Sequence, residues 1–288
     1  MPSFTIKSPA KVNLFLKVLG RRSDGYHELV TLFHRISLHD RLILKKINWP
    51  QFRLIIRHSK LGPARKNLIY RAYQTLRQVA SWKGGVEVTL EKNVPIAAGL
   101  GGGSSNAAHF LLGMNRLFDL KLSQKTLTKL GAQLGSDVPF FLSETNQAVG
   151  TGRGEKVKPI PAQGRLWFVL IVPHFRISTP LVYRKLRAAP LTRISHDVTI
   201  TSVFSGHQKK GKWLTFLRND LFQTSCSIRP ELKQIGALFD QLGVTRWLMS
   251  GSGPTMFSIH KSTREAMRIA RIIRRQKPSV KVFVCHTY

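Results

Sequence analysis

The chain has 288 residues, of which 42% are hydrophobic and 21% are charged. This composition excludes a disordered chain, and the length allows two ordinary domains with apolar cores. No apolar run approaches the roughly 18 residues that a membrane-spanning helix needs, and the N-terminus has no apolar stretch typical of an export signal. The two cysteines, Cys226 and Cys285, indicate neither a disulfide framework nor a zinc site. We therefore expect a soluble protein of the reducing cytoplasm.

The charge is strongly basic, because 46 Lys and Arg residues outnumber 14 Asp and Glu residues and give a net charge of +32. Such an excess is typical of proteins that bind nucleic acid or anionic membranes, although here both halves of the chain share it. A basic proteome of the source, or attraction of anionic substrates, would produce the same composition. Arginines recur at helical spacing on one side of a predicted helix, with apolar residues on its other side, which fits the solvated face of an amphipathic helix. The arginines are Arg264, Arg268, Arg271 and Arg275, and the apolar residues are Ala266, Ile269, Ala270 and Ile273.

In the first half of the chain, strand patterns come first and helices follow. Alternating apolar residues predict strands over 4–7, 11–20, 29–38 and 41–47, with a charged turn over 20–25. A helical period covers 68–80, followed by a strand from Val86 and helices over 106–118 and 123–134. Gly135 ends the last of these helices, and residues 150–154 predict a turn.

The second half begins with a fully apolar strand over 166–172. Helices are predicted over 179–186, 231–242 and 263–275, and strands over 247–249, 256–259 and 280–285. Residues 188–212 contain proline, glycine and a pair of lysines, and predict a long irregular connection. The pattern predicts an α+β protein of two domains, with residues 1–158 in the first and residues 159–288 in the second.

One segment joins a predicted strand to a predicted helix and holds four glycines within five positions. It consists of Pro95, Ile96, Ala97, Ala98, Gly99, Leu100, Gly101, Gly102, Gly103, Ser104 and Ser105. Glycines let a polyanion approach the backbone, the helix start directs unpaired N–H groups at it, and the serine hydroxyls add donors that can also cap the helix. The segment predicts a phosphate site, because a flexible linker would not be bounded so closely by a strand and an apolar helix. It lacks the lysine of a P-loop and the third glycine of a dinucleotide fingerprint.

Two charged side chains are candidates for chemistry at such a site. Lys11 and Asn13 share one face of a predicted strand, with Val12 on the other, although a lysine at a strand end is commonly solvated. Asp137 follows a helix end and precedes Pro139, which is typical of a helix N-cap. A carboxylate held at a helix start can also act as a general base, so the two roles are compatible.

Two turns are further candidates. The turn over 24–27 presents Tyr26 and His27, which suit a ligand contact as well as an ordinary surface turn. Residues 250–254 form a second small-residue loop, which suits a tight hairpin or a second approach to the same phosphates. The ten histidines show no metal-binding spacing, so we expect no metal held by the protein itself.

Three motifs, in order along most of the chain, resemble the superfamily of galactokinase, homoserine kinase, mevalonate kinase and phosphomevalonate kinase. They are residues 9–14 (PAKVNL), 99–105 (GLGGGSS) and 251–255 (GSGPT). Within this superfamily the chain most resembles the family of 4-diphosphocytidyl-2-C-methyl-D-erythritol kinases. The segments that carry this closer resemblance are 22–29 (RSDGYHEL), 67–72 (NLIYRA), 135–141 (GSDVPFF) and 152–155 (GRGE).

The resemblance implies an ATP-dependent kinase that phosphorylates the 2-hydroxyl of 4-(cytidine 5′-diphospho)-2-C-methyl-D-erythritol in non-mevalonate isoprenoid biosynthesis. It implies an N-terminal domain like domain 2 of ribosomal protein S5, a ferredoxin-like C-terminal domain, and an active site in the cleft between them. By position, Asp137 would accept the hydroxyl proton, and Lys11 would keep that carboxylate ionised and bond the attacking oxygen. The glycine segment would cradle the ATP phosphates. Mg²⁺ is expected with ATP, with no ligand assigned beyond the candidates Ser104 and Ser105.

The resemblance also implies contacts for both small molecules. The cytidine end of the substrate would meet Tyr26, His27, Phe33, Thr179 and Tyr183. Asn13 would hold the methylerythritol portion, and Asn67 and Lys92 would border the nucleoside of ATP. Ala97 and Ala98 replace a more glycine-rich start of the loop, which we expect to be tolerated where φ stays negative.

The implied partners are ATP and one small cytidine-diphosphate substrate, with no dedicated nucleic-acid partner, no membrane, and a monomer or weak homodimer. Two alternatives stay open. A mevalonate or homoserine kinase would share the three motifs but would not need the turn over 24–27. The other alternative is a basic nucleic-acid-binding protein on the same scaffold. If its affinity for DNA or RNA fell steeply with salt and showed no sequence preference, the binding would be explained by charge alone.

Overall fold

The computed structural model describes residues 2–59, 67–161, 164–186 and 217–288. The predicted irregular connection over 188–212 lies outside these residues. The chain forms two compact units, each assembled from separate stretches of sequence: unit 1 from Met1–Ala10, Leu38–Ile96 and Gly101–Glu144, and unit 2 from Lys11–Ser37, Ala97–Leu100 and Thr145–Tyr288. The boundary expected between residues 158 and 159 stays a prediction.

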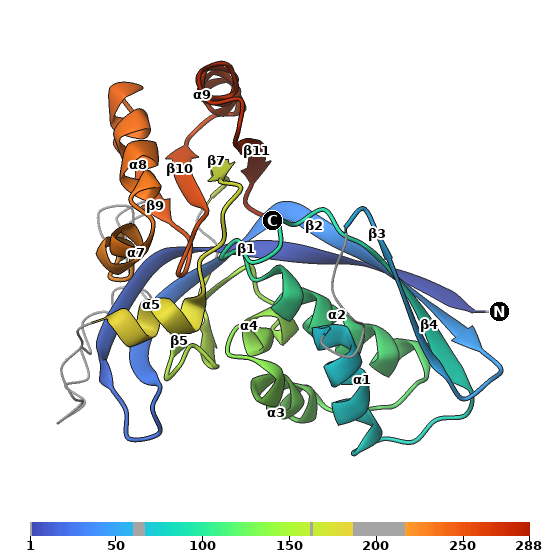
Figure 1. The fold of residues 1–288 in the computed structure, drawn as a ribbon. Coiled ribbons are helices and arrows are strands. Elements are labelled where there is room, and N and C mark those ends of the chain that lie inside the picture. Colours follow the sequence, from blue (N-terminus) through green and yellow to red (C-terminus); the bar gives the residue numbers. More distant parts are fainter. Residues whose placement is uncertain (1, 60–66, 162–163, 187–216) are drawn as a thin grey trace. The chain divides into compact units, whose positions relative to one another are not determined.

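The N-terminal elements are two long strands followed by shorter strands and helices (Figure 1). The strands are β1 (Ser3–Arg21), β2 (His27–Ile47), β3 (Phe52–Arg57) and β4 (Gly85–Glu91). The helices are α1 (Leu68–Arg77), α2 (Gly102–Leu117), α3 (Gln124–Leu134) and α4 (Val138–Leu142). Asn67 caps α1 by accepting a hydrogen bond from Ile69 N, and Ser123 caps α3 in the same way from Thr126 N, which fixes where both helices begin.

In unit 1, β4 lies between β2 and β3. It runs antiparallel to the second half of β2, with Glu91 opposite Arg41, and parallel to β3, with Val86 opposite Phe52. Helices α1 to α4 pack against one another and lie on one side of these strands (Figure 1). Their core contains Phe110, Phe140 and Phe141, which are at most 1% exposed. The sheet and these helices position the start of α2.

Unit 2 contains the C-terminal elements. They are β5 (Gln147–Thr151), β6 (Lys156–Pro159), β7 (Trp167–Val172), α5 (Thr179–Lys185), β8 (Arg218–Asn219), α7 (Phe222–Ile228), α8 (Glu231–Gln241), β9 (Trp247–Met249), β10 (Met256–His260), α9 (Thr263–Gln276) and β11 (Lys281–His286). Strands β7 and β9 to β11 form an antiparallel sheet of order β11-β7-β10-β9, against which α8 and α9 pack. This strand–helix–strand–strand–helix–strand arrangement is ferredoxin-like, as expected for the C-terminal domain.

Most predicted elements are present, and the differences lie at their joins. The predicted strands over 4–7 and 11–20 form the single strand β1, because the buried segment at Pro9 keeps the extended backbone that proline allows. The predicted strands over 29–38 and 41–47 likewise join as β2. Helix α2 begins at Gly102 rather than at residue 106. Gly101, with a φ of 68°, forms the turn before it. Because glycine has a low helix propensity, the sequence does not indicate that the helix already begins within the glycines. Strands β3, β5, β6 and β8 and helix α7 were not predicted.

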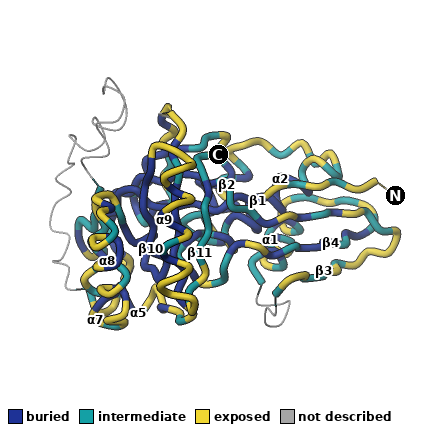
Figure 2. The backbone as a smooth tube through the Cα atoms, turned by 90° about the horizontal axis from the view of Figure 1, so that it is seen from above, coloured by how far each residue is buried: buried dark blue, intermediate teal, exposed yellow. Residues whose placement is uncertain are grey.

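Helix α9 carries the arginine stripe on its exposed side. Ala266, Ile269, Ala270 and Ile273 are at most 1% exposed, whereas the arginines of the stripe are exposed, as expected for an amphipathic helix. Figure 2 shows the same contrast between exposed α9 and the buried strand β10. Within the described residues, every helix is too short or too polar to cross a membrane.

Candidate active site

Lys11 begins a chain of buried polar contacts in unit 2. Lys11 is only 4% exposed, and its ammonium Nζ donates to Asn13 Oδ1 at 2.5 Å. Asn13 Nδ2 donates to Thr31 Oγ1 at 2.7 Å, and the Thr31 hydroxyl donates to Phe15 O at 2.8 Å. The prediction that Lys11 and Asn13 share a strand face is confirmed, because alternate strand residues point the same way. The lysine is buried, so the solvated alternative is wrong.

Two loops lie beside this lysine. The Lys11 main-chain N donates to Leu100 O at 3.0 Å, which ties the strand to the first part of the glycine segment. A Cβ placed on Gly251 would lie 3.6 Å from Lys11 Nζ, so the backbone of the second loop also reaches the ammonium. The Phe33 ring lies 5.5 Å from the same Nζ and is 1% exposed, so it supports the lysine from within the core.

The second small-residue loop packs onto the start of the glycine segment. Ser250 Oγ donates to Gly99 O at 2.8 Å. Asn219 Nδ2 donates to Gly251 O at 2.8 Å and so holds this loop from β8. Gly99 has a φ of 76°, and a Cβ there would lie 2.2 Å from Ser250 O. Gly99 is therefore required by the close approach of the two loops.

We expect Gly99→Ala to destabilise the protein by about 3 kcal/mol, measured as a shift of the urea unfolding curve. A left-handed alanine costs roughly 1–2 kcal/mol, and forced overpacking adds about 1–3 kcal/mol. Gly25→Ala is the matched control, because Gly25 has a φ of 82° but nothing within 4 Å of a Cβ. Gly25→Ala should lose only the stability that a left-handed alanine costs. Equal losses of stability in both variants would refute the loop contact as the cause.

The start of α2, in unit 1, has the features of an anion site. Gly101 occupies the N-cap position with no side-chain cap hydrogen bond, so neither serine caps the helix and that expectation is wrong. Gly103 is exposed and Ser104 is half-buried on the first turn. Uncapped N–H groups and the positive end of the helix dipole favour a negatively charged ligand there. Ala97 has a φ of 53°, so the condition of a negative φ under which this alanine was expected to be tolerated is not met, and the backbone of the segment is strained there.

Ser105 points away from that turn. It is 0% exposed, its hydroxyl accepts from Ser8 Oγ at 2.8 Å, and its main-chain N donates to Gly101 O at 2.9 Å. Ser104 is thus the serine whose hydroxyl is left at the turn surface, and the burial of Ser105 follows from its place one helical position further on.

The two residues expected near the nucleoside of ATP also bond within unit 1. Asn67 Oδ1 accepts from Ile69 N at 2.9 Å as the cap of α1. Lys92 is 8% exposed, and its Nζ donates to Asp40 Oδ2 and to Val94 O, each at 2.6 Å. Burial lowers the pKa of Lys92, while the charge of Asp40 and its hydrogen bond oppose that shift.

Asp137 stands where α3 ends and α4 begins. It occupies the N-cap position of α4 in a helical conformation, and its side chain makes no cap hydrogen bond. Pro139 lies in the first turn of α4, as the sequence predicted. The half-buried carboxylate is therefore placed by the helix start without serving as its cap.

The turn over 24–27 presents two rings of different exposure. Asp24 shapes the turn by accepting from Tyr26 N at 3.1 Å, and its hydrogen bond to Arg22 lowers the pKa of the Asp24 carboxyl. Tyr26 is 53% exposed, whereas His27 is 8% exposed and lies 5.1 Å from the Tyr183 ring. Burial, and to a smaller extent the charge of Arg21, lowers the pKa of His27, which favours a neutral ring.

Thr179 contacts the second small-residue loop within unit 2, because its Oγ1 lies 2.6 Å from Ser252 Oγ. Thr31 and Asn219 were missed as members of the site, whereas Ser252 lies in the small-residue loop over 250–254 that was already a candidate. The predicted strand around Thr31 also holds His34, Arg35 and Ser37, so no local signal singles Thr31 out, and Asn219 is recognisable only from its partners.

Comparison with known proteins defines the class of the chain. Residues 67–145 match the family model of the GHMP kinases N terminal domain, and residues 210–279 match that of the GHMP kinases C terminal. These matches confirm the superfamily resemblance and the two-domain α+β fold class. Within the class, the chain belongs to the 4-diphosphocytidyl-2-C-methyl-D-erythritol kinase family, as its curated relatives show.

The relative from Syntrophus aciditrophicus is 39% identical over 93% of this chain and 94% of that protein. A relative from Bacillus cereus (strain B4264) is 38% identical over 90% of this chain and 89% of that protein. Both are named 4-diphosphocytidyl-2-C-methyl-D-erythritol kinase.

Solved structures agree with this family. A crystal structure of 4-(cytidine 5′-diphospho)-2C-methyl-D-erythritol kinase has a TM-score of 0.78 and 35% identity, and covers 98% of both chains. Homoserine kinase from Cytophaga hutchinsonii has a TM-score of 0.71 at 17% identity, covering 100% of this chain and 95% of that chain. At that identity the likeness shows a common fold alone.

Proposed function

We propose that the protein transfers the γ-phosphoryl group of ATP to the 2-hydroxyl of 4-(cytidine 5′-diphospho)-2-C-methyl-D-erythritol, giving ADP and the 2-phosphate. The 39% identity to a kinase of that name, over 93% of the chain, is the observation that carries this proposal. The buried Lys11, beside Leu100 of the glycine segment and Gly251 of the second loop, supports it. The reaction belongs to non-mevalonate isoprenoid biosynthesis.

The start of α2 is assigned to the ATP phosphates. The uncapped amides of residues 102–104 and the Ser104 hydroxyl supply donors, and the helix dipole adds a favourable field. Ser105 supports the turn from inside unit 1, and Asn67 and Lys92 border the nucleoside. The described residues bring together no three His, Cys, Asp or Glu side chains that could hold a metal. We assign Mg²⁺ to the phosphates of ATP, which suits an ion that keeps several waters and few protein ligands.

Phosphoryl transfer depends mainly on positioning and charge stabilisation. We assign Asp137 as the base that accepts the proton of the 2-hydroxyl. Lys11 is assigned as the cation that bonds the attacking oxygen. Its hydrogen bond to Asn13 holds the ammonium in one orientation, since the lysine is buried and Asn13 is itself hydrogen-bonded to Thr31.

The aromatic group of unit 2 is assigned to the cytidine end of the substrate. Tyr26 offers an exposed ring for stacking. The His27 and Tyr183 rings contact each other and are less exposed than Tyr26. Thr179 completes this contact, Phe33 supports the pocket from within the core beside Lys11, and Asn13 holds the methylerythritol portion. We further propose that the enzyme acts in the cytoplasm as a monomer or weak homodimer on small molecules alone.

Release of ADP by the purified protein with Mg·ATP tests the function directly. The alcohols 4-(cytidine 5′-diphospho)-2-C-methyl-D-erythritol, mevalonate and homoserine are offered in parallel. We expect turnover with the cytidine substrate only, because the other two alcohols cannot use the Tyr26 and His27 contact. Turnover only with mevalonate or homoserine would overturn the substrate assignment. Turnover with none of the three would overturn the function and bring nucleic acid forward as the partner of the basic surface.

A further inference from the structure

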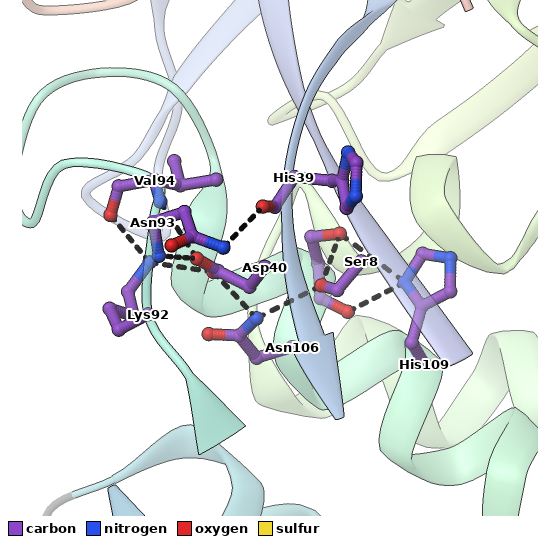
Figure 3. A network of polar contacts seen from close by, with 9 residues as sticks. Ser8, His39, Asp40, Lys92, Asn93, Val94, Asn106 and His109 are labelled. Carbon is purple, nitrogen blue, oxygen red and sulfur yellow. Dashed lines mark hydrogen bonds and ion pairs between the residues drawn. The ribbon is translucent and has the colours of Figure 1, made fainter. Parts of the chain in front are cut away.

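Asp40 is a fully buried carboxylate near the middle of β2, 0% exposed, that the mechanism above does not use (Figure 3). Its Oδ1 accepts from Asn93 N and Val94 N, each at 2.7 Å. Its Oδ2 accepts from Lys92 Nζ at 2.6 Å and from Asn106 Nδ2 at 2.9 Å. Two donors on each oxygen satisfy a carboxylate, so the group is bonded on every side by unit 1. Such saturation favours one rigid arrangement of its partners.

Those partners are the residues on either side of the glycine segment. Lys92, Asn93 and Val94 directly precede it, and Asn106 directly follows it. Their mutual attachment to Asp40 fixes both ends of the segment to the same point of β2. Figure 3 shows Lys92, directly after the end of β4, and Asn106, in α2, reaching that carboxylate.

Lys92 also contacts the first residue of α2. A Cβ on Gly102 would lie 3.1 Å from Lys92 Nζ and 3.0 Å from Val94 Cγ1, which leaves room for little more than a hydrogen. Residues 102 and 106 are one helical turn apart and share a face. The group around Asp40 therefore holds the first turn of α2 along its buried side, and leaves Gly103 and Ser104 on the other.

A second branch secures the same turn. Asn106 Nδ2 donates to Ser8 Oγ at 2.9 Å, and Ser8 Oγ donates to Ser105 Oγ at 2.8 Å. His109 Nδ1 lies 2.8 Å from Ser105 O, a carbonyl that can only accept, so this nitrogen carries the proton. Asp40 is thus the centre of a polar network that spans β1, β2, α2 and the segment directly after β4.

We propose that Asp40 is a positioning residue for ATP, which through Lys92 and Asn106 fixes the first turn of α2 so that its amides meet the phosphates in one orientation. This inference rests on the proposed use of ATP. Lys92 has a second role in the pair, since it neutralises a carboxylate that would otherwise place a negative charge beside a site for phosphate.

Two variants, Asp40→Asn and Asn106→Ala, test the proposal through ATP binding by calorimetry and amide hydrogen exchange over residues 99–106, in addition to turnover. Asp40→Asn removes the charge, and Asn106→Ala removes the links from α2 to Asp40 and to Ser8. Each should raise the Kd of ATP about tenfold, speed exchange of the amides of residues 102–104, and leave the KM of the alcohol substrate within about twofold. Asn106→Ala leaves the Lys92 pair intact and so keeps the test open if Asp40→Asn fails to fold.

Lys92→Met supplies the electrostatic test. It should weaken ATP binding more than the double variant Asp40→Asn/Lys92→Met, because only the single variant leaves an uncompensated buried anion. Glu91→Gln is the matched control; it removes a carboxylate next to Lys92 in sequence, 3.0 Å from Arg41 and outside the network, and should leave the Kd of ATP unchanged.

The outcomes separate this inference from the proposed function. Unchanged ATP affinity and exchange in Asp40→Asn and Asn106→Ala, with lower thermal stability alone, would reduce the network to a structural role and overturn the inference. An equal rise in Kd for Glu91→Gln would also overturn it, because the effect would not be specific to Asp40. Tight ATP binding by the wild type without phosphorylation of any offered alcohol would sink the function, and the binding measurements would still decide the role of Asp40.

Discussion

Asp137→Asn is expected to lower kcat by more than about a hundredfold, with the Kd of ATP within about twofold of the wild-type value. An amide cannot accept the proton of the attacking hydroxyl, and a positioned general base contributes typically about 10²–10⁴ in rate. The side chain makes no cap hydrogen bond to α4, so the change removes a chemical group while the helix start keeps its geometry. Steady-state ADP release and calorimetric ATP binding measure the two quantities.

Asp119→Asn is the control for this result. Asp119 is a surface residue whose side chain is 82% exposed, and its φ of 51° is one that asparagine adopts readily. It should retain full turnover. Near-normal kcat in Asp137→Asn would show that another group accepts the proton, and a loss confined to ATP affinity would move Asp137 from catalysis to nucleotide binding.

Lys11→Met is expected to reduce kcat by at least about a hundredfold with nearly intact ATP binding. Methionine fills most of the buried volume of the lysine stem but carries no charge, and loss of one preorganised group that stabilises transition-state charge costs about 10²–10³ in kcat. The change also leaves Asn13 Oδ1 without its Lys11 donor. Thermal unfolding run alongside should show a modest loss of stability, since a buried amide oxygen then lacks its partner.

Lys7→Met, four residues earlier on β1 and exposed, is the matched control for charge removal. It lowers the net charge by the same single unit and should leave kcat unchanged. Equal activity of Lys11→Met and wild type would refute the role assigned to the lysine. Equal losses in the Lys7 and Lys11 variants would instead attribute the effect to general attraction of anionic substrates by the basic surface.

Part of the glycine segment packs closely against other parts of the protein, in addition to the proposed contact with phosphate. Gly99 is required by Ser250, and Gly102 by Lys92 and Val94, so two of its four closely spaced glycines serve contacts within the protein. From the sequence all four were expected to serve a polyanion, because a glycine is equally suited to the close approach of a ligand and of another chain segment. Sequence position alone does not distinguish these causes.

Much of the site was predictable because its residues lie in short, ordered motifs. Lys11 and Asn13 share a strand face by the two-residue period, and Asp137 sits before Pro139 at a helix start. The glycine segment was placed correctly between a strand and a helix, since local turn and helix signals act over a few residues. The roles of these residues, and the assignment of Tyr26 and His27 to cytidine, stay predictions.

The sequence by itself determined the family, the α+β class and the type of most elements, because motif order and hydrophobic period are local properties of the chain. Only the tertiary structure decided that Ser105 turns inward, that Lys11 is buried, and that Asp40 joins Lys92 to Asn106. Asp40 and Asn106 are 66 positions apart, and Ser8 and Asn106 are 98 apart. Buried polar groups must find hydrogen-bond partners wherever the fold brings them, so partners that distant are set by packing of β1, β2, β4 and α2, and no local pattern encodes them.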